Sequence, residues 1–490
     1  MVKMKIIKIH ILIIGCFLLS CDDFLDLSPI SEETVDVAYD KASQIEAALT
    51  GAYESFQAEY YVWDNVLFQD VRSDNHYAGG DNPEVFQIDL LTISSTNSRL
   101  FKNWSNIYNA IAKANVVMEQ APLVTDPALT EERRQQIIGE ALYLRAYHYY
   151  TLVNKWGEIP LILESTSSTD KEDVNVAKSE IEQVYNRILM DLDRAIQLLP
   201  DTYGSDASVN KARATSGAAN ALAAKASLQR PVPDHRAALN YIEALESSAA
   251  GYRLIPYTDL FDGNHYNNAE SIMEVQYLGG NEGNFGPQLV LPPSISGDTW
   301  RKFVTPSQDL INAFNSENDN IRLNASVLFE NVNWVDEYWG NAVGSSIPFA
   351  FKWKNASAWA STNRPYILRY GDLVLLKAEA LTGLNRLDEA GEEVNRIRNR
   401  VSLPNLGQSA YANQSAMMDA ILKERRLELA QEAQRWDDLV RHNKVISVMN
   451  NLNEIDLRTG RRTDYNIDES KIYLPIPQEE LDRNPLLNPN

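Results

Sequence analysis

The spacing of apolar residues predicts long amphipathic helices over much of the chain. In residues 103–120, Trp104, Ile107 and Ile111 fall at the i, i+3, i+7 positions of one helix face. Comparable patterns occur in six further segments, at 131–157, 179–200, 215–230, 234–248, 364–401 and 415–442. This distribution predicts a mainly α-helical protein.

Breaking and capping residues mark several of the predicted helix ends. The second pattern stops at Gly157, and Pro160 follows just beyond it. Ser179 and Glu182 have the spacing of a capping box, and the helix that they begin ends before Pro200. The connections between these helices are therefore short, as in antiparallel helix pairs.

The segment 364–401 holds two apolar stripes that Gly383 separates. Two antiparallel helices within about 34 residues are typical of a tetratricopeptide unit. The small side chains of Ala378, Ala380 and Ala390 lie where two such helices have to touch. Units of this kind stack through contacts with their neighbours. A generic helical domain is the alternative interpretation.

The stretch from about 252 to 365 breaks the helical pattern and is dense in Gly, Asn, Pro and aromatic residues. Such a composition predicts loops joined by short strands, for example at Ser271–Tyr277. The expected fold class is therefore mainly α, with tetratricopeptide-like helix pairs packed on an irregular, loop-rich lobe that carries short strands.

The N-terminus has the features of a secretory signal. Residues 1–8 carry three lysines and no acid, and the apolar run 9–19 is shorter than the roughly 20 residues of a transmembrane helix. The stretch Leu18-Leu19-Ser20-Cys21 resembles a bacterial lipobox, which predicts cleavage after residue 20 and lipidation of Cys21. An ordinary signal peptide with an incidental cysteine is the alternative. The other cysteine, Cys16, lies in the segment that would be removed, so no disulfide is expected.

The charge of the chain excludes one class of partner. The formal net charge is −22, and loss of residues 1–20 with their three lysines would make it −25. A surface of this sign repels phosphate backbones, so nucleic acid is not an expected partner.

Six segments, in this order and behind a lipobox, resemble the SusD/RagB family of outer-membrane nutrient-binding lipoproteins. They are 103–119 (NWSNIYNAIAKANVVME), 139–163 (GEALYLRAYHYYTLVNKWGEIPLIL), 211–229 (KARATSGAANALAAKASLQ), 364–381 (RPYILRYGDLVLLKAEAL), 421–441 (ILKERRLELAQEAQRWDDLVR) and 473–490 (YLPIPQEELDRNPLLNPN). The resemblance implies a signal peptide at 1–20 and a single SusD-like domain at 21–490. About four tetratricopeptide-like units would occupy about 40–250 and 366–445, and the stretch 252–365 would be the ligand-binding insertion.

The resemblance also implies partners and a location. The protein would be lipid-anchored in the outer membrane, exposed at the cell surface, and would cover a SusC-like, TonB-dependent barrel as a lid. Ligands in the family are mostly oligosaccharides or polysaccharides, and in one branch peptides. A peptide-binding lid of the RagA/RagB type is therefore one alternative function, and a surface hydrolase is another.

Signatures of catalysis and of metal binding are absent from the sequence. The chain has no H-E-x-x-H, G-x-x-x-x-G-K-[ST] or G-x-S-x-G motif, and its histidines lack the spacing of zinc ligands. The oxygen-rich segments 262–268 and 315–320 lack the glycine and the terminal glutamate of an EF-hand, so solvated loops are favoured over structural calcium sites. We therefore predict a protein that is not an enzyme and that has no cofactor.

The charged stretch 421–441 has two interpretations. Arg425–Glu428, Glu432–Arg435 and Asp437–Arg441 have the three- or four-residue spacing of helical ion pairs. A catalytic cluster is one interpretation. We favour the other, a partly buried ion network that fixes the last long helix to its neighbours and uses Trp436 for packing.

Tryptophans in helical stripes are predicted to be core, and tryptophans in loop-like stretches are candidates for binding. The first group is Trp104, Trp156 and Trp436, and the second is Trp63, Trp300, Trp334, Trp339, Trp353 and Trp359. A flat ring flanked by polar side chains suits a pyranose, which has an apolar C–H face and a polar hydroxyl edge. Three clusters of this kind supply the predicted ligand-binding residues Tyr77, Asn75, Asp81, Trp300, Arg301, Trp334, Tyr338 and Trp339. Packing remains the alternative for any single ring.

Overall fold

A computed structural model describes residues 39–165, 168, 170–298, 302–331, 346–456 and 461–488. Most of these residues are helical, and the strands are short, as the apolar spacing predicts. The signal segment and Cys21 lie outside the described residues. In the part of the chain that is described, no helix is both long and apolar enough to span a bilayer.

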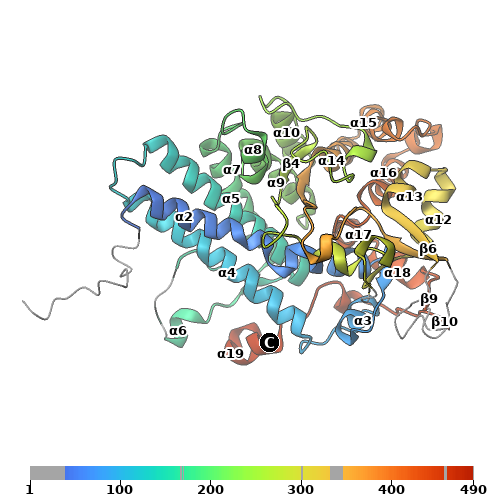
Figure 1. Cartoon of the computed structure of the whole chain (residues 1–490), viewed down its shortest axis with the longest axis horizontal. Coiled ribbons are helices and arrows are strands. Elements are labelled where there is room, and N and C mark those ends of the chain that lie inside the picture. The colour runs from blue at the N-terminus through green and yellow to red at the C-terminus, as the bar shows by residue number, and fades with distance from the viewer. Residues whose placement is uncertain are drawn as a thin grey trace, which may run out of the picture.

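The helices form a continuous stack in which each packs on the next along the chain (Figure 1). The stack consists of α2 (Ala42–Tyr53), α4 (Ser98–Gln120), α5 (Glu131–Trp156), α7 (Ile181–Leu198), α9 (Ser216–Gln229), α10 (His235–Glu246), α14 (Tyr370–Gly383), α15 (Leu387–Arg400) and α16 (Gln414–Leu429). Between α10 and α14 the chain leaves the stack for more than a hundred residues, yet α14 still packs directly on α10. The prediction of stacked helix pairs is confirmed.

The sequence of each helix explains its place in the stack. In α7, Val184, Ile188 and Leu192 share one buried face, so this helix has a single partner-facing stripe. In α9, by contrast, all residues from Gly217 to Leu228 are buried, because neighbours surround the helix. The small side chains of α9 allow these neighbouring helices to pack closely against it. The start of α7 differs from the prediction, because Glu180 and Gln183 form the capping box, one residue later than expected.

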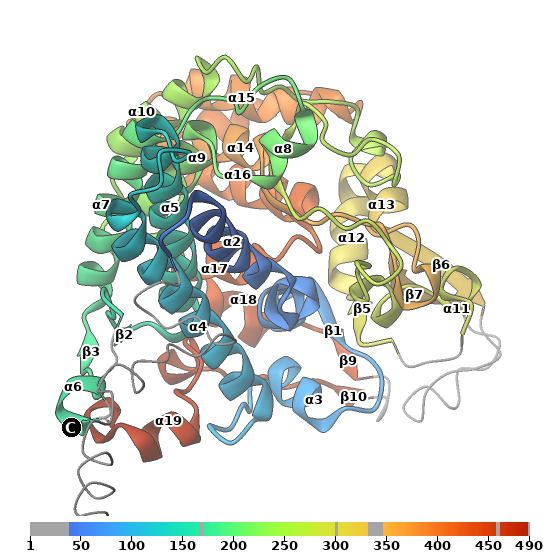
Figure 2. The same cartoon turned by 60° about the vertical axis from the view of Figure 1, so that its left-hand side comes forward.

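An irregular lobe leaves the stack at one end of the molecule (Figure 2). Its antiparallel strand pairs are β1 (His76–Ala78) with β5 (Val304–Pro306), β4 (Ser271–Glu274) with β8 (Tyr366–Arg369), and β6 (Val327–Asn331) with β7 (Ser346–Ala350). The strand expected at Ser271–Tyr277 is thus present but shorter. Two helices, α12 (Gln308–Glu317) and α13 (Asn320–Ser326), lie where the sequence predicts only loops and strands.

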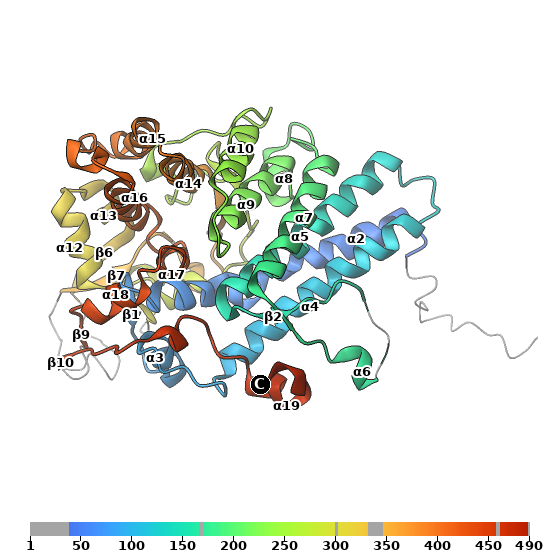
Figure 3. The ribbon, with the colours of Figure 1, turned by 180° about the vertical axis from the view of Figure 1, so that it is seen from behind.

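The remaining elements are short. The helices are α3 (Pro83–Asp89), α6 (Lys171–Val174), α8 (Ala207–Ala212), α11 (Pro293–Ser296), α17 (Arg435–Arg441), α18 (Val445–Asn451) and α19 (Gln478–Arg483). The strands are β2 (Ile159–Pro160), β3 (Lys178–Ser179), β9 (Ile455–Asp456) and β10 (Arg461–Arg462). Figure 3 shows the C-terminal helix α19 returning to the side of the stack, where it packs on α4.

The long helix expected at 415–442 is interrupted between α16 and α17. Gln431 and Ala433 adopt left-handed backbone angles there, with φ of 66° and 55°. Their N–H groups donate to the carboxylate of Asp70, at 3.3 Å from Gln431 and 2.8 Å from Ala433. Because Asp70 is fully buried and needs donors, these two bonds favour the break.

Ion pairs fix this region to the rest of the molecule, but not the pairs that the helical spacing predicts. Arg425 pairs with Asp372 and Asp438, and Arg435 pairs with Asp74 at 2.7 Å. Glu428 is fully buried among three arginines, namely Arg322, Arg369 and Arg400. Burial alone would raise the pKa of Glu428, but the three guanidinium groups outweigh it and hold that pKa well below the usual range. The network is therefore long-range and buried rather than local to one helix.

Candidate ligand-binding site

The pairing of β1 with β5 places one predicted cluster, around Tyr77, beside the segment that follows another cluster in the sequence. Tyr77 lies opposite Thr305 in this pair, and the N–H of Gly79 donates to the carbonyl of Phe303 at 3.2 Å. Gly79 is required here, because a Cβ would lie 2.9 Å from the hydroxyl of Thr305 and closer still to the carbonyl oxygen of Lys302. The segment 75–81 is therefore held against the segment 302–306.

The strands that flank the third cluster in the sequence belong to the same lobe as β5. β5 packs against β7, and β7 is the second strand of the hairpin that it forms with β6. The residues Trp334, Tyr338 and Trp339 fall between Asn331, where β6 ends, and Ser346, where β7 begins. They lie outside the described residues, as do Trp300 and Arg301. We call the described segments 77–81, 298, 302–306, 327–331 and 346–350 the platform. Residues 302–306 are buried, whereas Phe329, Asn331 and Ser346 are exposed.

The predicted ligand-binding residues that the structure describes differ in accessibility. Tyr77 and Asp81 are partly exposed, and both have internal interactions. Asn75 is only 1% exposed, and both the nitrogen and the oxygen of its side-chain amide form hydrogen bonds within the protein. Its nitrogen donates to Asp70 at 3.0 Å, and its oxygen accepts from Arg426 at 2.9 Å. The prediction that Asn75 contacts ligand is therefore corrected: its side chain holds the loop in place.

Arg426 links both strands of the platform to the helical stack. Its guanidinium group donates to the carbonyl of Asp74 at 2.7 Å, immediately before β1. The same group pairs at 2.7 Å with Asp309, which lies in the first turn of α12, just after β5. Burial would raise the pKa of Asp74, but Arg426 and Arg435 outweigh it and hold the pKa well below the usual range. Charged Asp74 thus anchors the start of the loop.

Tryptophans outside the stack differ in accessibility. Trp63 was counted among the loop rings, but it is 3% exposed and lies in the short π-helix η3 (Tyr60–Asp64). Its ring packs 5.7 Å from that of Phe303, and the guanidinium of Arg99 lies 4.7 Å above it. Trp63 is therefore core beneath the platform. Trp353 is partly buried, whereas Trp359 is 41% exposed.

The tryptophans assigned to the core are buried as predicted. Trp104 and Trp156 make an edge-to-face contact with ring centroids 5.3 Å apart, which joins α4 to the end of α5. Trp436 is completely buried, with Arg72 stacked 4.2 Å above its ring. Helical spacing thus identified these three rings correctly, because their partners lie on the same stripe or on an adjacent helix.

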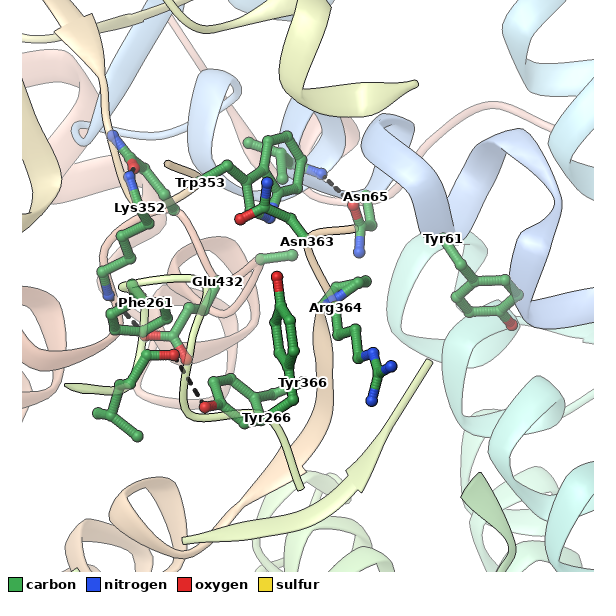
Figure 4. Close-up of a pocket in the computed structure, with 16 residues that line it drawn as sticks. Tyr61, Asn65, Phe261, Tyr266, Lys352, Trp353, Asn363, Arg364, Tyr366 and Glu432 are labelled. Carbon is green, nitrogen blue, oxygen red and sulfur yellow. Dashed lines mark hydrogen bonds and ion pairs between the residues drawn. The ribbon is translucent and has the colours of Figure 1, made fainter. Parts of the chain in front are cut away.

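A narrow cleft, which the sequence did not indicate, separates the lobe from the stack (Figure 4). Tyr266, Arg364 and Tyr366 lie on the lobe side, and Tyr61 faces them from the N-terminal helices. The guanidinium of Arg364 lies 4.6 Å from the ring of Tyr266. The open volume is 60 Å³, well below the 300–1,000 Å³ of typical ligand pockets. The platform is therefore the better candidate for an extended ligand.

Buried charges form the floor of this cleft. Lys352 and Arg369 both pair with Glu432, at 2.5 Å in each case. On the far side, the hydroxyl of Tyr61 bonds to Nδ1 of His148 at 2.7 Å. Burial lowers the pKa of His148 to about 3, so the imidazole is neutral at neutral pH. These groups are used internally, which favours a structural role for them.

Two wider grooves, of 280 and 350 Å³, lie on the helical stack. One is lined by Trp104, Tyr108 and Leu487, and the other by Phe56 and Met273 among others. Both are lined mainly by apolar atoms.

The oxygen-rich segments give limited support to a cation site. Asp259, Asp262 and His265 place one ligand atom each within 4.8 Å of the others, but Asp262 and His265 already pair with each other at 2.7 Å. In the segment 315–320, Asp319 caps α13 and pairs with Arg322, so its carboxylate is used. The expectation that no cofactor is bound stays a prediction.

Comparisons with known proteins point to the same family at both ends of the chain. Residues 23–228 match the family described as starch-binding and associating with the outer membrane, and residues 330–490 match the SusD family. "SusD-like protein P2" of Formosa agariphila is 26% identical over 521 residues, which cover 99% of each chain. A SusD superfamily protein from Bacteroides vulgatus has a similar structure, with a TM-score of 0.77 and 24% identity over 92% of this chain and 99% of that one. A laminarin-binding SusD-like protein has a TM-score of 0.74 and 25% identity, over 91% and 98% of the two chains.

Proposed function

The chain belongs to the SusD/RagB family, and on this premise we propose that it is a surface lipoprotein that binds a glycan without cleaving it and delivers it to a SusC-like, TonB-dependent barrel. One matched family is described as starch-binding and one structural relative as laminarin-binding, which supports a glycan as the ligand. Neither identifies which glycan this chain takes.

The observation that carries the proposal is the pairing of β1 with β5. Residues 76–79 and 303–306 are far apart in sequence, yet this pair makes them neighbours, and the second predicted cluster directly precedes 303–306 in the chain. Both predicted clusters were selected because they combine an aromatic ring with amide, carboxylate or guanidinium groups. A pyranose needs such a combination, a flat apolar surface for its C–H face and polar groups for its hydroxyls. Rings are suited to this role because they lose little conformational entropy when they are fixed.

The rigidity of the platform supports a binding role. Arg426 and Asp74 hold the loop before β1, and Trp63 with Phe303 fills the space beneath it. A surface that is already ordered in the free protein avoids the entropy loss of ordering it on binding. The proposed platform therefore needs no large rearrangement to take a ligand.

The anchoring part of the proposal rests on the lipobox-like stretch that ends at Cys21. The description of the matched family as associating with the outer membrane is consistent with a lipid anchor. Acyl chains contribute about 0.8 kcal/mol for each buried CH₂, and several chains together hold a protein firmly at a bilayer. Surface attachment would place the platform where it meets extracellular polymer.

The test is binding of the purified mature protein to an array of polysaccharides, with starch and laminarin included, followed by calorimetry on the strongest ligand. Tyr77→Ala should weaken that binding, and Met190→Ala is the matched control, since Met190 is 60% exposed on α7. Equal binding by both variants would move the site away from the platform. Binding to peptides but to no glycan would favour the peptide-binding alternative, and release of cleaved sugar would favour a hydrolase.

A further inference from the structure

The last described segment of the chain, residues 471–488, forms a strap that runs back along the helical stack (Figure 3). Beyond Lys471, its regular structure is limited to α19 and the 3-10 helix η11 (Pro485–Leu487). Most of its side chains are exposed or partly exposed, and the buried ones are those of Leu474, Pro477, Asn484 and Leu487. Segments with so little burial open at a lower cost in free energy than packed helices do. The strap is therefore a candidate for local opening.

Hydrogen bonds from side chains and backbone attach the first residues of the strap to the rest of the molecule. The indole N–H groups of Trp436 and Trp156 donate to two carbonyls of the strap, at 3.0 and 3.1 Å. The guanidinium group of Arg72 donates to a third, the carbonyl of Lys471, at 2.6 Å. The N–H of Leu474 donates to the backbone of α5 at 2.7 Å. Of these donors, Arg72 is the one that carries a full charge.

The charged donor, Arg72, is deeply buried. It is 2% exposed, and its guanidinium group stacks 4.2 Å from the ring of Trp436. Among the described residues it forms no ion pair, and its Nε and Nη1 atoms have no hydrogen-bond partner. The carboxylate of Asp437 acts on it electrostatically, but both oxygens of that group already accept from Lys155, at 2.9 and 3.0 Å. Two buried cations therefore share one carboxylate, and one positive charge remains uncompensated.

Three other arginines are equally buried, but their charges are compensated. Arg322, Arg369 and Arg425 each pair with two or more carboxylates. These carboxylates outweigh the effect of burial and raise the pKa of each arginine, whereas burial lowers the pKa of Arg72 to about 9. Taking a charged group out of water is costly unless an opposite charge compensates for it. The strap contacts Arg72 through an uncharged carbonyl, so closing the strap carries such a cost.

We propose that the strap is a releasable latch, which opens while the helical stack stays folded, because closing it buries the uncompensated charge of Arg72. Apolar contacts of Leu474 and the hydrogen bonds from Trp156 and Trp436 maintain the closed state. Opening would hydrate the guanidinium group and free both indole N–H groups. It would thereby expose a surface of hydrogen-bond donors at the end of α5. The latch does not depend on which ligand the platform binds.

Hydrogen–deuterium exchange of the purified mature protein, measured by mass spectrometry, tests the latch. Peptides from the strap are compared with peptides from α5 in wild type, in Arg72→Met and in the control Arg425→Met. In wild type, the amides of the strap should be less protected than those of α5. Arg72→Met removes the charge and keeps a long side chain that can contact the ring of Trp436. It should slow exchange in the strap by roughly tenfold or more, because the desolvation cost that it removes outweighs one lost hydrogen bond.

The control variant separates the uncompensated charge from a compensated one. Arg425→Met leaves Asp372 and Asp438 without this partner, so it should lower the melting temperature and should not slow exchange in the strap.

Slower exchange of the strap in Arg72→Met, with α5 unchanged, supports the latch. Unchanged or faster exchange in that variant overturns it, and so does equal slowing in Arg425→Met. If Arg72→Met does not fold, Arg72→Gln, which removes the charge but keeps a donor, supplies the same comparison. Wild type provides a test that needs no variant, because protection of the strap equal to that of α5 also overturns the latch.

Discussion

The substitution Gly79→Ala tests the contact between the early loop and the segment that precedes β5. The added Cβ would lie 2.9 Å from the hydroxyl of Thr305 and still closer to the backbone oxygen of Lys302, and ordinary contact begins near 3.4 Å. Backbone atoms would have to separate by about 1 Å to restore normal van der Waals distances. The carbonyl of Lys302 cannot rotate away as a long side chain can, because β5 continues directly from it.

The expected cost follows from this geometry. Overpacking of a closely fitted site typically costs 1–3 kcal/mol, and the hydrogen bond from Gly79 to Phe303 would lengthen as well. We expect a free energy of unfolding lowered by about 2 kcal/mol. Glycan affinity should fall further than this alone would require, because Tyr77 would no longer be held beside the segment 303–306.

The matched control is Gly51→Ala in α2, where an added Cβ would meet nothing within 4 Å. Alanine is favoured over glycine within a helix by roughly 0.5–1 kcal/mol, so this variant should be at least as stable as wild type and bind normally. The assays are urea unfolding and calorimetry with the strongest glycan of the array. Wild-type stability and affinity in Gly79→Ala would refute the described contact and, with it, the platform built on that contact.

Three further predictions concern the rings, a buried acid and the anchor. Glycan binding should weaken, with little change in melting temperature, in each of the variants Trp300→Ala, Trp334→Ala and Trp339→Ala. Loss of a buried ring would instead lower the free energy of unfolding by about 3–5 kcal/mol. Strongly lowered melting temperatures would therefore assign these rings to the core. Burial raises the pKa of Asp70 to about 6, above its unfolded value, so its stabilisation is complete below about pH 4 and declines as the pH rises to about 6. In urea unfolding, the free energy of unfolding of wild type relative to that of Asp70→Asn should therefore fall by on the order of 3 kcal/mol between about pH 4 and about pH 6. A difference between the two proteins that does not change with pH would contradict the raised pKa of Asp70. Cys21→Ala should move the protein from the membrane fraction to the soluble fraction without altering its melting curve, and retention with unchanged lipid labelling would disprove the anchor.

Local patterns predicted the helices well because the relevant interactions are local. Trp104 and Ile107 share a helix face wherever that helix is placed, so their burial follows from spacing and a packing partner. The same rule misplaced the capping box of α7 by one residue. Ser179 is the preferred kind of N-cap, but it pairs with Ile159 in the β2–β3 ladder, so Glu180 takes the N-cap position.

The candidate site was only partly predictable. Aromatic and polar composition selects the segments of Tyr77 and of residues 298–301, and strand pairing places Tyr77 opposite Thr305, which follows the second segment in the chain. Composition did not distinguish Asn75, which is buried, from Asp81, which is partly exposed. It also grouped Trp63 with the exposed rings, although that ring is covered by Phe303 and Arg99 from distant parts of the chain.

The sequence by itself determined the helices, the family resemblance and the candidate anchor at Cys21, because each depends on residues that are near one another in the chain. Only the tertiary structure decided what depends on partners far away. Asp70 meets Ala433 across 363 residues and favours a helix break there, which no local pattern indicates. The left-handed turn at Trp359 exists because buried Asn284 and Ser361 maintain it. Unfavourable local conformations of this kind are stable only when contacts between distant segments compensate for them, so a sequence read locally predicts against them.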